Sequence, residues 1–328
     1  MNEHFLTSIN IEQFKCFHDF SASGFKRVNL IGGKNNIGKT AFLEAAFINV
    51  NAKNVGELLF TLSSVKIIRE SFNHLIEMQK GVSHIELTRK YLASIKRYSV
   101  KSNQYDQKFQ LDEKNSTRAY EITLSTISDS EQICIYERDI YSISSPLSGH
   151  SWMIDPYGFS NFELAQIFQS IQRNDQEAEL NRLLHEFDPN IEAFKMIGEQ
   201  PQCKINGEYL DLTELGSGFA HYISIICALH AGQNRHLFID ELGNGIHYSQ
   251  LDRLWEVILT ISKHVQCQVF ATTHSKEMLE SFARVSKRLN EQDISYTTLV
   301  KNKQQEIKAL TLDYELLQDS LAQAHEIR

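Results

Sequence analysis

The 328-residue chain has only four prolines, and it has no internal repeat, low-complexity segment or long apolar run. No stretch approaches the roughly eighteen apolar residues of a membrane span. The opening MNEHFLTSINIEQF lacks a basic region followed by an apolar one, as a secretion signal would have. We therefore expect a protein that is neither secreted nor embedded in a membrane. The 42% hydrophobic content suffices for a full core in one large or two moderate domains.

Cysteine is also scarce, and its positions are scattered. The five cysteines are Cys16, Cys134, Cys203, Cys227 and Cys267. Their odd number and the lack of any C-x-x-C pair argue against a disulfide framework and against a zinc site. This pattern favours a reducing, cytoplasmic environment.

Positive charge is in deficit, because 33 Lys and Arg face 41 Asp and Glu, a net charge of -8. A phosphate backbone would repel the molecule as a whole, so any contact with nucleic acid must be local. The charge is uneven: residues 80–118 hold nine basic and four acidic residues, whereas residues 129–195 hold twelve acidic and four basic ones. Two oppositely charged faces are the expected result.

The two ends of the chain show the alternation of strands and helices that is typical of an α/β fold. Residues 5–11 and 27–32 read as short strands, and the second leads through a glycine turn into a helix over residues 39–50. Farther on, we predict helices over 219–231 and 249–263 and strands over 236–240 and 266–271. This order predicts a parallel sheet.

The middle of the chain has a different pattern. Between residues 52 and 150, a helical stretch at 55–79 is followed by alternating segments at 84–92, 108–113, 119–127 and 132–141. These segments predict antiparallel strands, whose order the sequence does not give. Residues 161–198 have helical periodicity, interrupted at Pro189, and predict an acidic arm or lobe.

A phosphate-binding loop stands between the predicted strand and helix near the N-terminus. Residues 33–40, GKNNIGKT, match the pattern G-x-x-x-x-G-K-[ST]. Lys39 is expected to reach the β- and γ-phosphates, and Thr40 to bind Mg²⁺. Such a match arises by chance in roughly one chain in a hundred of this length, but the strand and helix around it favour function. We expect ATP to contact Gly33, Lys34, Asn35, Asn36, Ile37, Gly38, Lys39, Thr40 and Ala41.

Two carboxylates end the predicted strand 236–240. Asp240 is expected to hold Mg²⁺, and Glu241 to act as the general base that accepts a proton from the attacking water. A strand whose end is simply solvated by two acids is the alternative. His274 follows the next strand, where it is expected to donate a hydrogen bond to the γ-phosphate, although a lone histidine is more often structural.

A second glycine turn, LGSGF at residues 215–219, precedes the helix 219–231. Glycines before a helix N-terminus are typical of an anion site, although an ordinary turn explains them equally well. The order of phosphate loop, LGSGF, acidic strand end and histidine resembles the ABC ATPases of the SMC and OLD (overcoming lysogenisation defect) groups. The segments INIEQFKCF, LLHEFDPNIEAF and LTELGSGFAHYISI also resemble these groups.

This resemblance implies the fold, the cofactors and the assembly. The implied fold is an α/β P-loop NTPase of the ABC-ATPase type, with a mixed sheet, an antiparallel N-terminal subdomain and a helical lobe. Residues 1–328 are then a single head. The nucleotide-binding core takes residues 1–50 and 200–328, an inserted mixed segment takes about 52–150, and the helical lobe takes about 155–200.

The resemblance also assigns residues to the bound nucleotide. It implies that two heads enclose two ATP molecules head to tail, with Ser217 and Gly218 contacting the γ-phosphate that the partner's phosphate loop holds. Lys15 is implied to approach the phosphates. The sequence departs from the family pattern at Leu242-Gly243-Asn244 and at Tyr248. Only residues 275–328 follow His274, too few for the TOPRIM nuclease of OLD proteins, so we expect a separate chain to do any cutting.

Three functions remain as hypotheses. The first is an ATPase that regulates a separate effector, a nuclease or toxin, in bacterial defence against phages. The second is a clamp for DNA repair or recombination, supported only by the basic stretch with Tyr91, Tyr98 and Tyr105. The third is a scaffold that binds ATP without hydrolysing it, which Glu241 and His274 disfavour.

Overall fold

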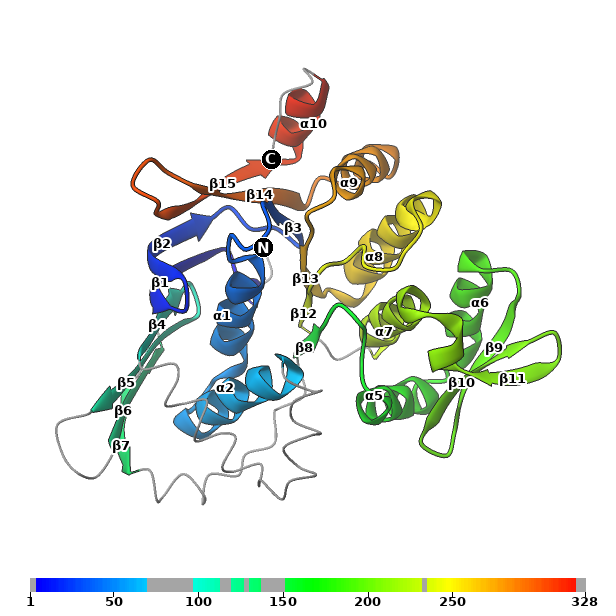
Figure 1. Cartoon of the computed structure of the whole chain (residues 1–328), viewed down its shortest axis with the longest axis horizontal. Helices are drawn as coiled ribbons and strands as arrows, with labels where there is room; N and C mark the ends of the chain where they lie inside the picture. Colours follow the sequence, from blue (N-terminus) through cyan, green and yellow to red (C-terminus); the bar gives the residue numbers. More distant parts are fainter. Residues whose placement is uncertain are drawn as a thin grey trace. The chain divides into compact units, whose positions relative to one another are not determined.

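The computed structural model describes residues 4–69, 97–112, 119–126, 130–136, 151–231 and 235–322. The chain forms two compact units (Figure 1). The first consists of Met1–Gly24, Asn35–Ser151 and Leu299–Leu310, and the second of Phe25–Lys34, Trp152–Thr298 and Thr311–Arg328. Residues 33–40, the predicted phosphate loop, contain one of the points at which the chain passes from one unit to the other.

The first unit is built on an antiparallel sheet with the strand order β2-β1-β4-β5-β6-β7. Its strands are β1 (Ser8–Phe14), β2 (Phe17–Ser23), β4 (Arg97–Ser102), β5 (Tyr105–Asp112), β6 (Ala119–Thr126) and β7 (Ser130–Tyr136). The predicted antiparallel strands are confirmed at β5, β6 and β7. The helical stretch after residue 69 and the predicted strand at 84–92 lie outside the described residues.

Strands β1 and β2 form a hairpin with a two-residue turn. Phe14 pairs with Phe17, so Lys15 and Cys16 make the turn, and Lys15 adopts a left-handed backbone conformation with φ 51°. Ile9 and Ile11 are buried, as the period of two in a half-buried strand requires, and the register shift between Ile11 and Gln13 places Phe14, three residues on, in the buried set as well.

Helix α1 (Lys39–Asn51) packs against this sheet and is followed by α2 (Val55–Arg69). The amide of Gln107 on β5 donates a 2.9 Å hydrogen bond to the carbonyl of Asn49 on α1. Tyr98 on β4 is 1% exposed, and its hydroxyl donates to Gln107 at 2.8 Å. Tyr98 is therefore part of the core, and its ring is not available to stack on a nucleic-acid base.

A second sheet, most of whose residues belong to the second unit, has the strand order β15-β14-β3-β13-β12-β8. Its strands are β3 (Val28–Gly33), β8 (Ser151–Ile154), β12 (His236–Ile239), β13 (Gln268–Thr272), β14 (Ile294–Lys301) and β15 (Ile307–Asp313). Strands β3, β13 and β12 are parallel, which confirms the predicted alternation. Because parallel strands end at one edge, Gly33, Asp240 and Thr272 lie at the same edge of the sheet.

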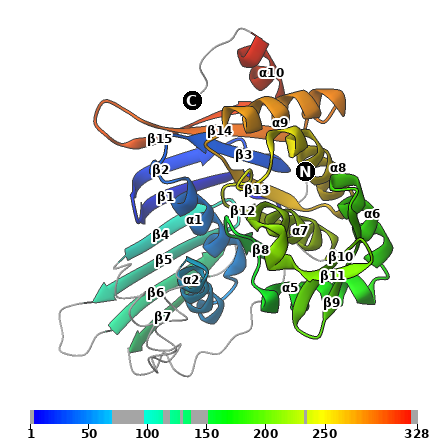
Figure 2. The same cartoon turned by 45° about the vertical axis from the view of Figure 1, so that its right-hand side comes forward.

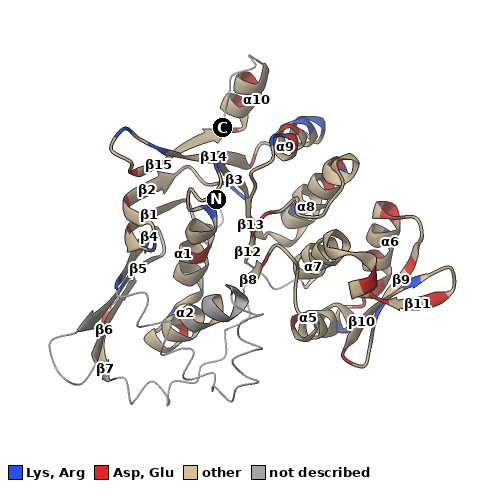
Figure 3. Ribbon diagram, in the orientation of Figure 1, with Lys and Arg blue, Asp and Glu red and all other residues tan. Residues whose placement is uncertain are grey.

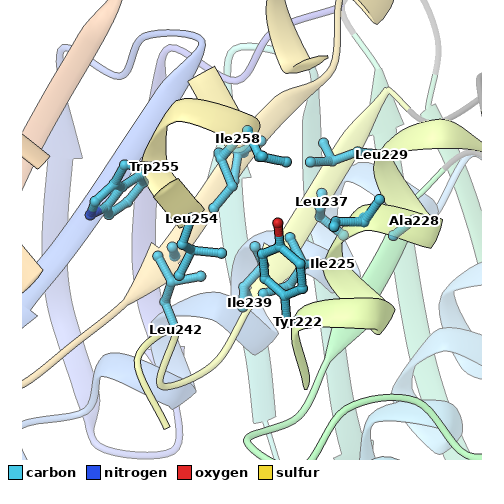
Figure 4. Packing of buried hydrophobic residues seen from close by; sticks show 14 of the residues in the cluster. Tyr222, Ile225, Ala228, Leu229, Leu237, Ile239, Leu242, Leu254, Trp255 and Ile258 are labelled. Atoms are coloured by element: carbon cyan, nitrogen blue, oxygen red, sulfur yellow. The ribbon is translucent and has the colours of Figure 1, made fainter. Parts of the chain in front are cut away.

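Helices α7 (Ser217–His230), α8 (Leu251–Val265) and α9 (Lys276–Arg288) lie one after another along this sheet (Figures 1 and 2). Figure 4 shows the apolar side chains that meet between them: Tyr222, Ile225, Ala228 and Leu229 from α7, Leu237 and Ile239 from β12, Leu242 after it, and Leu254, Trp255 and Ile258 from α8. The indole of the buried Trp255 donates to the Met278 carbonyl at 3.1 Å. This core fixes the loops that follow β12 and β13.

A small antiparallel sheet, β11-β10-β9, and two helices complete the second unit. They are α5 (Asn161–Arg173), α6 (Glu177–Phe187), β9 (Ile191–Ile197), β10 (Gln200–Ile205) and β11 (Glu208–Asp211). The helical prediction for 161–198 is therefore wrong for 191–197. Ile191 and Phe194 have helical spacing, but the register shift opposite Ile205 lets a strand bury both.

Charge is distributed unevenly over the second unit. Figure 3 shows acidic residues on α6 and basic residues on α9. Several basic side chains of α9 are already engaged, since Arg284 pairs with Asp252 and Arg288 with Glu256. In the part of the chain that the structure describes, no helix combines the length and the apolar character needed to cross a membrane.

Candidate functional site

The predicted phosphate loop has the backbone geometry of an anion-binding turn. Gly33, Asn36 and Gly38 have φ values of 139°, 60° and 109°, and Gly38 is the N-cap of α1. The helix begins at Lys39, where the Phe42 N–H donates to the Gly38 carbonyl at 2.9 Å. Positive φ values turn successive backbone N–H groups toward one side, and the helix N-terminus adds a partial positive charge. The loop therefore has the electrostatics required to bind phosphate.

The turn between β1 and β2 supports this loop from within the first unit. A methyl group built on Gly38 would lie 2.7 Å from Cys16 Sγ and 3.2 Å from Phe17 Cζ, so only glycine fits here. Next to Cys16, the Lys15 ammonium forms an ion pair with Glu44 on α1. The sequence predicts Lys15 near the phosphates, and the structure adds a carboxylate partner that sequence reasoning missed.

At the edge of the parallel sheet, Asp240 is 6% exposed and held by a neighbouring threonine. The Thr272 hydroxyl donates to Asp240 Oδ1 at 2.7 Å and accepts from the backbone N–H of Glu241 at 2.8 Å. One hydroxyl therefore fixes both residues of the acidic pair. The sequence analysis did not predict a role for Thr272. Its position at the end of the strand that follows the acidic pair is the feature that could have indicated one.

Glu241 and His274 form a hydrogen-bonded pair. His274 Nδ1 lies 2.7 Å from Glu241 Oε2, and their side chains are 60% and 27% exposed. Glu241 has a φ of 50°, an uncommon backbone conformation for a non-glycine residue and one that is often found at functional sites. The structure thus brings together the predicted general base, Glu241, and the predicted histidine, His274, within reach of water.

Asp155 is a further acidic residue near this edge. It follows β8, whose last carbonyl, at Ile154, accepts from the Asp240 N–H at 2.9 Å. Burial raises the pKa of Asp155, and hydrogen bonds from the backbone N–H groups of Tyr157 and Gly158 oppose that rise. No motif in the sequence predicted its position.

The LGSGF turn begins α7 and packs closely on the loop after Glu241. Gly216, with φ 89°, is the N-cap, and Ser217 is the exposed first residue of the helix. A methyl group on Gly218 would lie 2.0 Å from the Gly245 carbonyl oxygen, and one on Gly245 would lie 2.7 Å from the Gly218 nitrogen. The close contact between Gly218 and Gly245 therefore fixes the predicted residues Ser217 and Gly218 against the loop that follows Glu241. The sequence analysis did not predict this role of Gly245.

The N-termini of α1 and α7 share one electrostatic feature. Neither has a side-chain cap or an acidic residue in its first turn. Among the α-helices of the described ranges, α2, α5, α6, α8, α9 and α10 (Tyr314–Ala322) each carry at least one first-turn acid. Because first-turn acids complement the helix dipole, their absence leaves α1 and α7 suited to an external anion.

The parallel sheet, the loop before α1 and the acidic strand end define an α/β P-loop NTPase, as predicted. The chain belongs to the family of AAA ATPase domains, whose model matches residues 57–279. The matched segment contains Ser217, Asp240, Glu241 and His274, while the phosphate loop precedes it. A Helicobacter pylori protein described as an ATP/GTP phosphatase is 26% identical over 338 residues, covering 89% of this chain and 90% of that protein.

Solved structures show the same fold. An SMC head bound to the C-terminal winged-helix domain of ScpA has a TM-score of 0.52 at 10% identity, covering 95% of this chain and 98% of that one. An SMC head with an extended coiled coil, bound to the C-terminal domain of ScpA derived from Pyrococcus furiosus, has a TM-score of 0.51 at 12% identity, with coverages of 98% and 99%. The predicted likeness to SMC-type ABC ATPases is confirmed at the level of fold.

Proposed function

We propose that this chain hydrolyses Mg·ATP by the residues that the sequence singles out. The observation that carries this proposal is the Glu241–His274 pair beside Asp240, at the sheet edge that also gives rise to the phosphate loop. A carboxylate within reach of water can accept its proton as the water attacks, which typically contributes 10²–10⁴-fold to the rate. In this role Glu241 is the base, and His274 orients it.

The residues present fit the two groups that such chemistry needs. The loop before α1 offers the triphosphate a helix N-terminus without a first-turn acid, and Lys39 adds a positive charge. Thr40 and Asp240 are the residues that would hold Mg²⁺, because hydroxyl and carboxylate oxygens are ligands of the kind it prefers. When bound, Mg²⁺ supplies positive charge against the negative charge that develops on the phosphates.

GTP is a second candidate substrate, because the Helicobacter pylori relative is described as a phosphatase of both nucleotides. The proposed site residues would bind phosphates and a metal ion, which are common to ATP and GTP. Steady-state turnover with each nucleotide, at equal concentration and with Mg²⁺, tests the choice. Equal kcat/KM values would make the enzyme a general purine triphosphatase.

We further propose that two copies assemble head to tail, with Ser217 and Gly218 of one copy facing the γ-phosphate bound by the other. The exposed, uncapped start of α7 supports this arrangement. Light scattering with and without Mg·ATP tests it on wild type, Glu241→Gln and Ser217→Asp. ATP should raise the molar mass of the first two, and Glu241→Gln should keep the larger form after wild type has returned to the smaller one.

Ser217→Asp separates assembly from binding. The added carboxylate repels a phosphate at α7, so this variant should bind ATP but fail to gain mass. Turnover of Glu241→Gln should fall by about 10²-fold or more. A mass that never responds to ATP, together with normal turnover by Ser217→Asp, would contradict the head-to-tail arrangement and leave the hydrolysis proposal intact.

The biological role we propose is control of a separate effector protein, a nuclease or toxin, in bacterial defence. It rests on the resemblance to OLD-type ATPases, and the SMC heads of similar fold were solved with bound ScpA domains. The domain division expected from the sequence, a core of residues 1–50 and 200–328 with an insertion and a lobe, belongs to the same proposal. Purification of the Glu241→Gln form with ATP should retain the effector, and homo-oligomer alone would count against this role.

A further inference from the structure

Thr272, at the end of β13, makes hydrogen bonds to three successive residues that follow β12. The last paired residues of these parallel strands directly precede Asp240 and Thr272. Beyond them, the Thr272 hydroxyl donates to Asp240 Oδ1 at 2.7 Å and accepts from the Glu241 N–H at 2.8 Å. The Thr272 carbonyl accepts from the Leu242 N–H at 2.9 Å. One residue thus holds the whole segment in which the chain leaves the sheet.

The Thr272 hydroxyl is fixed in both of its hydrogen-bonding roles. Thr272 is fully buried, so water does not compete for the hydroxyl. Its single proton goes to a carboxylate, and such a hydrogen bond is stronger than one between neutral groups. Threonine is β-branched, which restricts χ1 and keeps the oxygen in one place. The hydroxyl is therefore a fixed donor for Asp240 and a fixed acceptor for Glu241.

The acceptor side of this hydroxyl holds an uncommon backbone conformation. Glu241 has a φ of 50°, which persists only where the surrounding structure holds it. Thr272 binds the N–H groups of Glu241 and of Leu242, the two peptide units around this turn. The direction of the Glu241 side chain, which reaches His274, depends on the same backbone turn.

We propose that Thr272 is a positioning residue, which makes the orientation of the proposed base, Glu241, depend on the proposed metal ligand, Asp240. The inference rests on the proposed function, because it assumes that Asp240 holds Mg²⁺ and that Glu241 accepts a proton from water. Hydrogen bonds in a chain strengthen one another, so the Glu241 N–H, the hydroxyl and the Asp240 carboxylate act as a unit. In this role Thr272 acts only through its two neighbours and contacts no reacting atom.

Turnover of full-length variants at position 272 tests this role. Thr272→Val removes the hydroxyl and keeps the shape of the side chain, so kcat should fall about tenfold or more, while KM for ATP changes little. Thr272→Ser keeps the hydroxyl and should stay close to wild type. Thr272→Cys, whose thiol is a weak donor, should fall between the two. It also provides the measurement if Thr272→Val does not fold.

A double variant shows whether Thr272 acts through Glu241. If it does, Thr272→Val should add little to the loss that Glu241→Gln already causes, because the base is missing in both proteins. Independent action would multiply the two losses.

The metal side of the role is measured without turnover. Binding of a fluorescent ATP analogue is titrated with Mg²⁺ in the Glu241→Gln background. Thr272→Val should raise the Mg²⁺ concentration needed for half-maximal enhancement of binding by about threefold or more, because Asp240 is no longer held in one orientation.

Thr297→Val is the matched control. Thr297 on β14 is also fully buried, and its hydroxyl lies 3.0 Å from that of Thr311. In the sheet, β3 and β13 separate β14 from β12, so this variant loses a buried hydroxyl away from the acidic pair. Thermal unfolding should show both Thr297→Val and Thr272→Val to be less stable than wild type. Only Thr272→Val should change turnover and Mg²⁺ dependence.

Four results would each overturn the positioning role. They are turnover of Thr272→Val close to that of wild type, equal losses in Thr272→Ser and Thr272→Val, multiplied losses in the double variant, and unchanged Mg²⁺ dependence. If wild type does not hydrolyse ATP, or if Glu241→Gln hydrolyses it as fast as wild type does, the proposed function fails and the inference fails with it. If Glu241→Gln is slow and only the Thr272 results differ from expectation, the role of Thr272 alone is rejected.

Discussion

Helices α5 and α9 begin in one way, and α1 and α7 in another. At α5, the Ser160 hydroxyl accepts from the Glu163 N–H, and the Glu163 carboxylate accepts from the Ser160 N–H at 2.8 Å, which completes a capping box. At α9, the Ser275 hydroxyl accepts from the Met278 N–H at 3.0 Å. Helices α1 and α7 begin instead at Gly38 and Gly216, with no side-chain cap.

The difference separates helices that serve the fold from helices that serve a ligand. A missing cap is not sufficient by itself, because α6 and α8 also lack one, but both carry first-turn acids, Glu177 and Asp252 among them. Only the combination of a positive-φ glycine and no first-turn acid sets α1 and α7 apart within the described residues. A side-chain cap is worth about 1 kcal/mol, and its absence at these two helices suits an anion that arrives from outside.

Giving α1 the first-turn acid that it lacks is the most direct test of this contrast between helices. Ala41 lies in the first turn of α1, and Ala41→Asp places a carboxylate next to the proposed phosphate site. Two like charges about 5 Å apart repel by about 3 kcal/mol at an effective dielectric constant of about 20. Equilibrium titration should therefore show ATP binding weakened by about 10²-fold, with no loss of stability, since the acid favours the helix dipole.

Ala178→Asp is the matched control for this change. Ala178 is exposed in the first turn of α6, a helix that already starts with Glu177 and Glu179. The same substitution there should leave the Kd for ATP unchanged. If Ala41→Asp also binds ATP as wild type does, α1 does not receive the phosphates, and the contrast between the two kinds of helix has no functional meaning.

The contrast also explains how much the sequence could predict. The phosphate loop is contiguous, so a pattern of eight residues (33–40) predicted the loop and the start of α1 together. The acidic pair was predicted in the same way, from the end of a buried strand. Motifs of this kind can be recognised from the sequence because the residues that act together lie within a few positions of one another.

Contacts between distant segments were not predictable in that way. Gly245 meets Gly218 across 27 positions (245 minus 218), and Lys15 meets Glu44 across 29. Both contacts depend on how strands and helices are packed, which no spacing along the chain encodes. The strand at Ile191–Ile197 was missed for a related reason, because a register shift in its pairing reproduced helical spacing of the buried residues.

An effect of similar size concerns the buried face of α7. His221, one turn after Ser217, is fully buried. Burial lowers its pKa to about 4, and a hydrogen bond with the backbone of Asn244 opposes this lowering only in part. Between pH 6.5 and about 4 the unfolded chain binds a proton that the folded chain does not, so the free energy of unfolding falls as pH falls. The loss should total about 3 kcal/mol and end below pH 4.

Urea unfolding of wild type and His221→Leu over this pH range measures the effect. Carboxylates elsewhere contribute to the acid sensitivity of both proteins, so the difference between the two curves is the quantity of interest. The free energy of unfolding of wild type minus that of His221→Leu should decrease as pH falls, because only wild type must keep a buried histidine neutral. Parallel curves would show that folding does not lower the pKa of His221.

The smallest expected effect comes from removing single hydroxyl groups at the starts of α5 and α7. Ser160→Ala removes the cap of α5 and should lower the free energy of unfolding by about 1 kcal/mol. Ser217→Ala removes a serine from the start of α7, where it caps nothing, and should change stability by only a few tenths of a kcal/mol. Ser160→Ala should leave ATP turnover unchanged, whereas Ser217→Ala should reduce it. Equal losses of stability would mean that both serines stabilise the fold, and this would contradict a ligand-binding role for the start of α7.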